Sequence, residues 1–284
     1  MPGLLPHVDP DGLLEYSVVY TDRSLNHMSR AFQGVMNDIS RGLKQAYGAR
    51  SVAVVPGGGT YAMEAVARQF AGGAKTLVIR NGFFSFRWTQ ILEAGGIAAA
   101  STVLKARRTG SGPQAPFAPA PIDEVVDTIR RERPAVVFAP HVETAAGIIL
   151  PDDYLRELSA AVHEVGGLFV LDCIASGAMW VDMRATGVDV LLSAPQKGWS
   201  ATPCAGLVML GEEARARIDA TTSSSFACDL KRWLGIMETY ENGGHAYHAT
   251  MPTDGLRVLR GAIAETLEFG LDTARAAQQR EEMT

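Results

Sequence analysis

"DVLLSAPQKGWSATP", residues 189–203, joins an apolar run to a single lysine, Lys197, that is surrounded by small residues. The run is apolar at successive positions, which is typical of a strand buried on both faces of a parallel sheet. Sheets of that kind bind ligands beyond the carboxyl ends of their strands. The stretch therefore predicts an α/β fold and places an amine at the edge where a ligand would bind.

The rest of the chain repeats this rhythm of short apolar runs and longer amphipathic ones. The expected strands cover 51–55, 75–80, 97–104, 135–140, 168–172, 189–194 and 206–210. The expected helices cover 61–71, 83–94, 121–132, 152–165, 228–241 and a long stretch from 253 to about 277. Such alternation is typical of a sheet covered by helices on both faces. The predicted fold is a three-layer α/β/α sandwich around a mostly parallel seven-stranded sheet.

The chain divides into three expected parts. Residues 1–30 form an N-terminal arm, 31–252 a large domain, and 253–284 a long helix with a charged end. The Pro- and Gly-rich segment 109–121 lies between expected strands and is too short to separate two domains, so we expect a surface loop there.

Composition favours a small-molecule partner. The chain of 284 residues has 26 basic and 31 acidic residues and a formal net charge of −5, which gives no basic surface for nucleic acid. No apolar run approaches the roughly 18 residues that span a bilayer. The three cysteines lack paired spacing, which favours the cytoplasm. His141, His245 and His248 have no ligand spacing, so no metal site is predicted.

VVPGGGTYAMEA, residues 54–65, leads from a strand through three glycines into a helix. Exposed amides at such a helix start bind phosphate, although an ordinary glycine-rich turn has the same pattern. The P-loop pattern fails because no lysine follows. The dinucleotide pattern matches Gly57, Gly59 and Ala62, but Arg80 and Asn81 follow the next strand where an acidic residue is required. A nicotinamide-dependent oxidoreductase therefore remains an alternative.

Asp172 ends the strand of 168–172, and Lys197 follows the next expected strand, 25 positions later. If these strands are neighbours, both side chains reach one crevice. A phosphate cradle, a carboxylate and an amine are what pyridoxal phosphate requires: the amine forms a Schiff base, and the carboxylate keeps the pyridine nitrogen protonated. We expect the small residues around Lys197 to admit the cofactor and to leave the amine partly desolvated.

In these segments the sequence resembles a class V aminotransferase of fold type I, in the branch of alanine–glyoxylate and serine–pyruvate aminotransferases. The similarity runs in matching order along nearly the whole chain, with the D-x-x-A-S and S-x-x-Q-K segments most specific. It implies Lys197 as the Schiff-base lysine, with Asp172 at the pyridine nitrogen. It also implies Phe84 of RNGFF and Ile174 on the two ring faces and Thr144 of PHVETAAG near the ring hydroxyl.

The resemblance also implies a phosphate site and a homodimer. AYHATMPT is similar to a segment in which tyrosine and threonine reach the phosphate in the neighbouring subunit, here Tyr247 and Thr250. The phosphate contacts implied within one chain are Gly58, Gly59, Thr60 and Gln196.

The function implied is transfer of an amino group from alanine or serine to glyoxylate or pyruvate. Aminophosphonate transamination and β-lyase chemistry are alternatives on the same cofactor. Family members carry a further C-terminal segment with an arginine for the substrate carboxylate, whereas this sequence stops at Thr284. We therefore expect the small C-terminal domain to be absent, and a cofactor-binding fragment without turnover is a further alternative.

Overall fold

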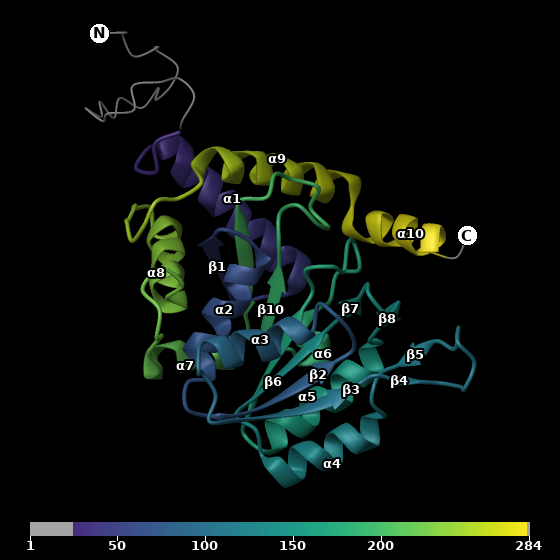
Figure 1. The fold of residues 1–284 in the computed structure, drawn as a ribbon. Coiled ribbons are helices and arrows are strands. Elements are labelled where there is room, and N and C mark those ends of the chain that lie inside the picture. The colour runs from purple at the N-terminus through teal and green to yellow at the C-terminus, as the bar shows by residue number, and fades with distance from the viewer. Residues whose placement is uncertain (1–24, 283–284) are drawn as a thin grey trace.

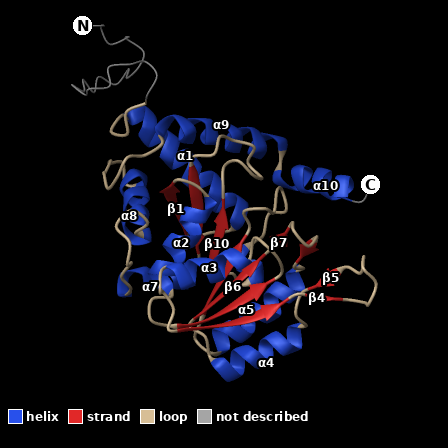
Figure 2. Ribbon diagram, in the orientation of Figure 1, coloured by secondary structure: helices blue, strands red, loops and turns tan. Residues whose placement is uncertain are grey.

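A seven-stranded sheet forms the centre of the computed structural model, which describes residues 25–282 (Figures 1 and 2). Its strands, in spatial order, are β1 (Ser51–Pro56), β11 (Ala205–Leu210), β10 (Val190–Ser193), β9 (Leu168–Asp172), β6 (Val136–Pro140), β2 (Lys75–Arg80) and β3 (Ala100–Lys105). The pairs from β10 to β3 are parallel, and β11 is antiparallel to both neighbours. The mostly parallel seven-stranded sheet is thus confirmed.

Helices lie on both faces of this sheet. The helices are α1 (Arg30–Tyr47), α2 (Gly59–Phe70), α3 (Phe86–Ala94), α4 (Ile122–Glu132), α5 (Asp152–Glu164), α6 (Met183–Thr186), α7 (Glu212–Ala220), α8 (Leu230–Glu241), α9 (Thr253–Phe269) and α10 (Leu271–Glu282). Because parallel crossovers are right-handed, connections that run toward β3 and those that return place their helices on opposite faces. Accordingly, α2 and α3 cover one face, while α4 and α5 cover the other.

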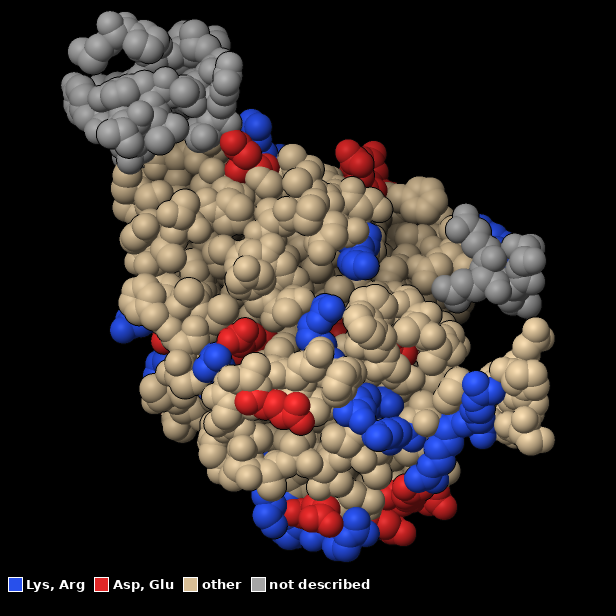
Figure 3. All heavy atoms as spheres, in the orientation of Figure 1, with Lys and Arg blue, Asp and Glu red and all other residues tan. Residues whose placement is uncertain are grey.

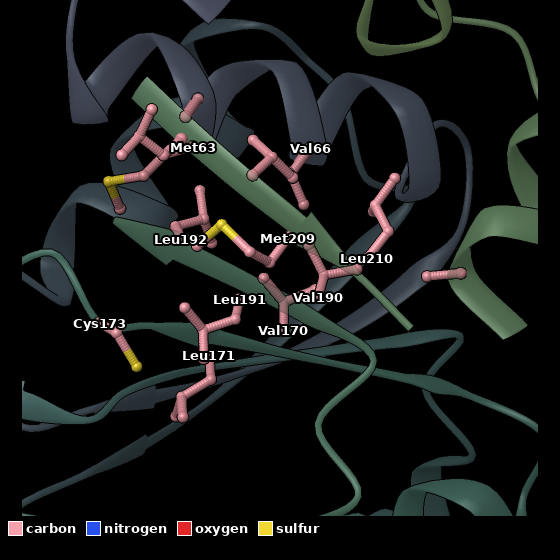
Figure 4. Packing of buried hydrophobic residues seen from close by; sticks show 14 of the residues in the cluster. Met63, Val66, Val170, Leu171, Cys173, Val190, Leu191, Leu192, Met209 and Leu210 are labelled. Atoms are coloured by element: carbon pink, nitrogen blue, oxygen red, sulfur yellow. The ribbon is translucent and has the colours of Figure 1, made fainter. Parts of the chain in front are cut away.

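The interior is built from strands that are apolar at every position. All five residues of β9 and all four of β10 are buried. Figure 4 shows Met63 and Val66 of α2 lying over Leu192 and Met209 of the sheet. Burial of an aliphatic side chain of this size contributes about 1.5–3 kcal/mol, so the central strands contribute strongly to the stability of the fold.

The strand directions bring six strand ends to one edge. β11 is antiparallel to β1 and to β10, so β1 runs in the same direction as the parallel strands. The turn after β1, the Asp172 end of β9 and the turn after β10 consequently lie on the same side of the sheet. This edge is where the predicted ligand-binding residues belong.

Two short hairpins project from the sheet. β4 (Arg107–Arg108) pairs with β5 (Phe117–Ala118) and encloses most of the loop predicted at 109–121. β7 (Val142–Glu143) pairs with β8 (Ile148–Ile149) directly after β6.

On the face shown in Figure 3, basic and acidic side chains lie side by side along the lower rim, over α4.

The structure differs from the predicted helices at several places, and it also contains α6 and α7, for which no range was predicted. The single helix expected over 253–277 is two helices, because Gly270 between α9 and α10 has a φ of 95°, which favours glycine. Helix α1 was not predicted, although Ser29 caps it and accepts a hydrogen bond from Phe32 N at 3.0 Å. Most of the predicted N-terminal arm lies outside the described residues.

Helix α10 is attached to the sheet layer by specific contacts. Trp180 Nε1 donates a hydrogen bond to Leu271 O at 3.1 Å, and Ala178 N donates to Gln278 Oε1 at 2.5 Å.

In the described part of the chain, no helix combines the length and apolar character that crossing a bilayer demands.

Two glycines of α1 provide a test of its packing. A Cβ on Gly42 would lie within van der Waals overlap of Ile263 Cγ2 in α9, whereas a Cβ on Gly34 would meet open space. We expect Gly42→Ala to lower the free energy of unfolding by about 1–3 kcal/mol, because the branched Ile263 must shift. Gly34→Ala should raise it by up to about 1 kcal/mol through helix propensity. Urea unfolding measures both, and equal effects would contradict this packing.

Candidate functional site

Asp172 is a buried acidic group at the ligand edge. Its side chain ends β9, and Oδ1 accepts a hydrogen bond from Ile174 N at 2.9 Å. Burial raises the pKa of this carboxyl from 3.8 to about 6, and the charge of Glu143 acts in the same direction. The positive charges of Arg87 and Lys197 lower it. Asp172 therefore lies within electrostatic reach of a lysine and an arginine from two other elements.

The glycine turn lies against the residues that follow Asp172. Gly57 N donates to Cys204 O at 2.9 Å, which anchors the turn between β1 and α2. A Cβ on Gly59 would lie 2.5 Å from Ile174 Cδ1, the end of a flexible side chain, so a larger residue there would require the Ile174 side chain to shift. The first N–H groups of α2, from Gly59 onward, open toward the ligand edge, as helix starts do. The structure thus brings Gly58, Gly59 and Thr60 together with Ile174 and Asp172.

Lys197 lies in the turn after β10. Its backbone N donates to Ala194 O at 3.3 Å, and its O accepts from Ser200 N at 3.0 Å. The next residue, Gly198, packs so closely on Gly177 O that a Cβ there would overlap it. This contact joins the lysine turn to the segment after Asp172. Lys197 is an exposed residue in this single chain, and partial desolvation of its amine stays a prediction.

The Phe84 segment is held by a buried carboxylate. Glu143 Oε1 accepts a hydrogen bond from Phe84 N at 3.1 Å, and Oε2 accepts from Ser85 N at 2.9 Å and from Ser85 Oγ at 2.7 Å. The side chain of Phe84 is 38 % exposed, so it is not a core residue. Its place at the ligand edge suits contact with a ring. Thr144 follows Glu143 and is exposed in the β7–β8 turn.

Arg87 is a residue of this edge that sequence reasoning missed. Its Nη1 donates to Thr60 Oγ1 at 3.1 Å, and its guanidinium lies 5.8 Å from the centre of the Phe84 ring. It therefore connects the glycine turn to the aromatic segment. A signal was present, because Arg87 follows Phe84 by three positions at the start of a predicted helix, which favours contact between them.

The remaining predicted residues lie in different surroundings. Gln196 is exposed beside Lys197 in the same turn. Tyr247 is 65 % exposed and its ring centre lies 5.5 Å from that of His27, while Thr250 is also exposed. Neither Tyr247 nor Thr250 joins the group around Asp172 in this single chain.

His141 and Cys173 are packed next to the site. His141 Nδ1 lies 2.7 Å from Ser176 Oγ, and burial lowers the pKa of the imidazole to about 4, so it is neutral at pH 7. Burial raises the pKa of the Cys173 thiol, which leaves it unreactive at neutral pH. Within residues 25–282, no three His, Cys, Asp or Glu side chains gather as a metal ion requires.

Comparisons with known proteins show which family this chain resembles. A family model described as Aminotransferase class-V matches residues 12–283. An alanine–glyoxylate aminotransferase of Rattus norvegicus is 27 % identical over 89 % of this chain and 59 % of its own length. A 2-aminoethylphosphonate–pyruvate transaminase of Paraburkholderia phymatum is 29 % identical over 90 % of this chain and 64 % of its own.

A solved structure shows the same architecture. The alanine–glyoxylate aminotransferase of a Nostoc species superimposes with a TM-score of 0.73 at 25 % identity, covering 87 % of this chain and 63 % of that one. The chain thus spans about six tenths of the length of these relatives.

The raised pKa of Asp172 predicts a pH-dependent stability. The carboxyl of Asp172 loses its proton at a lower pH in the unfolded chain than in the folded chain. Its contribution to the free energy of unfolding is therefore complete below about pH 4 and is lost as the pH rises through about 6. Asp172→Asn keeps the acceptor for Ile174 N and cannot ionise. Relative to the unmodified protein, its free energy of unfolding should rise over this window by up to about 3 kcal/mol and then stay constant.

Urea unfolding of ligand-free protein at pH 4, 5, 6 and 7 measures this difference. Asp127→Asn, at an exposed position of α4, is the control for the loss of one exposed carboxylate. If the free energy of unfolding of Asp172→Asn differs from that of the unmodified protein by the same amount at every pH from 4 to 7, the assigned burial of Asp172 is contradicted.

Proposed function

The chain belongs to the class V aminotransferase family, and from that premise we propose that it binds pyridoxal phosphate and transfers an amino group from a small amino acid to a 2-oxo acid. One observation carries the proposal. The glycine turn, the buried carboxylate of Asp172 and the amine of Lys197 come from three distant segments and meet at one edge of the sheet. Their chemistry is an anion cradle, an acceptor for a pyridinium proton and a nucleophile.

The residues fit this cofactor. Pyridoxal phosphate, when bound, supplies an aldehyde that condenses with amines and a pyridine ring that withdraws electrons. The Lys197 amine would tether it, and the Asp172 carboxylate, ionised above about pH 6, would hold the pyridine proton. The amides of Gly58, Gly59 and Thr60 would bind the phosphate. The absence of a Cβ on Gly59 supports this placement, because it lets the turn approach Ile174.

Other side chains would orient the ring. Ile174 lies beside the glycine turn and Phe84 is exposed on a fixed segment, so the two would enclose the ring from opposite faces. Thr144 would donate to the ring hydroxyl, and Gln196 would lie beside the phosphate. Lys197 Nζ, once an amino acid has replaced it, would take the proton from the substrate Cα, acting as a general base.

The substrates proposed are alanine or serine as donor and glyoxylate or pyruvate as acceptor. Relatives named alanine–glyoxylate aminotransferases support this choice. An aminophosphonate donor is the second candidate, supported by the transaminase of Paraburkholderia phymatum. β-Lyase chemistry on the same residues is a weaker alternative.

We also propose a homodimer in the cytoplasm. Tyr247 and Thr250 are exposed and would reach the phosphate site of a second copy. Large aromatic side chains that are exposed in one chain support a partner surface, namely Tyr61, Phe83 and Phe226, which are 55 %, 66 % and 77 % exposed.

A titration tests the proposal. Added pyridoxal phosphate should produce a visible absorption band that amino donors shift, with alanine, serine and 2-aminoethylphosphonate compared in parallel. Lys197→Ala should lose the band, whereas Lys231→Ala, an exposed lysine of α8, should retain it.

The outcomes separate the alternatives. A band that no donor shifts would indicate a cofactor-binding fragment without turnover. Binding of a nicotinamide dinucleotide in place of pyridoxal phosphate would contradict the proposal in favour of an oxidoreductase.

A further inference from the structure

Glu143 is a buried carboxylate that the proposed reaction does not use. Its side chain is fully buried at the end of β7. Within residues 25–282, no lysine, arginine or histidine nitrogen lies within ion-pair distance of it. Burying a carboxylate is costly unless hydrogen bonds compensate it. The groups that compensate it show what the residue does.

The donors to Glu143 all belong to its own hairpin or to the segment of Phe84. Phe84 N, Ser85 N and Ser85 Oγ donate to it at 2.7–3.1 Å, and Ala145 N lies at 3.4 Å. Ser85 Oγ in turn accepts from Asn81 N at 2.8 Å and from Gly82 N at 3.0 Å. The turn of residues 81–85 is therefore closed around one carboxylate.

Gly82 completes this arrangement. A Cβ at that position would lie 2.7 Å from Glu143 Cγ, so the backbone packs directly on the acidic side chain. The side chain of Phe84 is therefore exposed, while its backbone is held by hydrogen bonds to the buried Glu143.

The negative charge of Glu143 also acts on Asp172. The charged groups that act on Asp172 are Glu143 from β7, Arg87 from α3 and Lys197 from the turn after β10. Glu143 alone among these opposes ionisation of Asp172. Its position therefore affects the carboxylate of the site as well as the aromatic side chain.

We propose that Glu143 is a positioning residue of the candidate cofactor site, whose buried carboxylate fixes the backbone of Phe84 before a ligand binds. The inference rests on the proposed cofactor site. It assigns to Glu143 no contact with substrate and no proton transfer.

A double-mutant cycle tests the proposal. Glu143→Gln should lower the equilibrium affinity for pyridoxal phosphate about tenfold, corresponding to about 1.4 kcal/mol, and should reduce the visible circular dichroism per bound cofactor. Because the residue acts through the aromatic side chain, the same change in a Phe84→Ala background should have little further effect. Ser85→Ala removes one donor and should act in the same direction with a smaller loss. Glu157→Gln, at an exposed position of α5, is the control.

Hydrogen exchange of the ligand-free protein provides a readout without the cofactor. The amides of Phe84 and Ser85 should exchange faster in Glu143→Gln than in the unmodified protein, with amides of β9 unchanged. Equal losses of affinity with and without Phe84, or unchanged exchange at these amides, would overturn the inference. Failure of the unmodified protein to bind pyridoxal phosphate would instead contradict the proposed function, and the exchange measurement would still decide the role of Glu143.

Discussion

The carboxylate of Asp172, buried at the end of the central strand β9, determines which groups are favoured beside it. Burial is the largest of the causes that raise the pKa of the Asp172 carboxyl, whose resulting value of about 6 leaves it mostly ionised at pH 7. One backbone amide, from Ile174, and the charges of Arg87 and Lys197 bring its ionisation back within reach. The edge is therefore arranged so that a cationic group placed beside Asp172 is strongly favoured.

Close backbone contacts bring the other groups to this carboxylate. Gly59 lets the turn after β1 approach Ile174, and Gly198 lets the lysine turn rest on Gly177. A Cβ at Gly198 would overlap the backbone of Gly177, whereas one at Gly59 would require the Ile174 side chain to shift. The close contact between the lysine turn and the segment after Asp172 therefore depends on the missing Cβ of Gly198.

The sequence allowed prediction of the features that depend on local pattern. Strands that are apolar at every position predicted the sheet, and residues at strand ends predicted the places of Asp172 and Lys197. Helix α1 has apolar residues at helical spacing, Phe32, Val35, Met36 and Ile39, so its signal was present and was not used. The break at Gly270 depends on a positive φ, which the periodicity of the residues around it does not reveal.

Contacts between distant positions could not be predicted in this way. Arg87 meets Thr60 across 27 positions, and Glu143 meets Phe84 across 59, so both depend on how crossovers stack the strand ends. The exposure of Lys197 likewise follows from the turn it occupies in the fold. Tyr247 and Thr250 concern a second copy, and one chain does not test their role.

The most direct test of the central claim is to locate the covalent link. The chain has five lysines, Lys44, Lys75, Lys105, Lys197 and Lys231. After incubation with pyridoxal phosphate, reduction with borohydride and proteolysis, mass spectrometry should find the cofactor on the peptide that contains Lys197. Attachment mainly at any of the other four lysines would contradict an account in which the amine opposite Asp172 holds the cofactor.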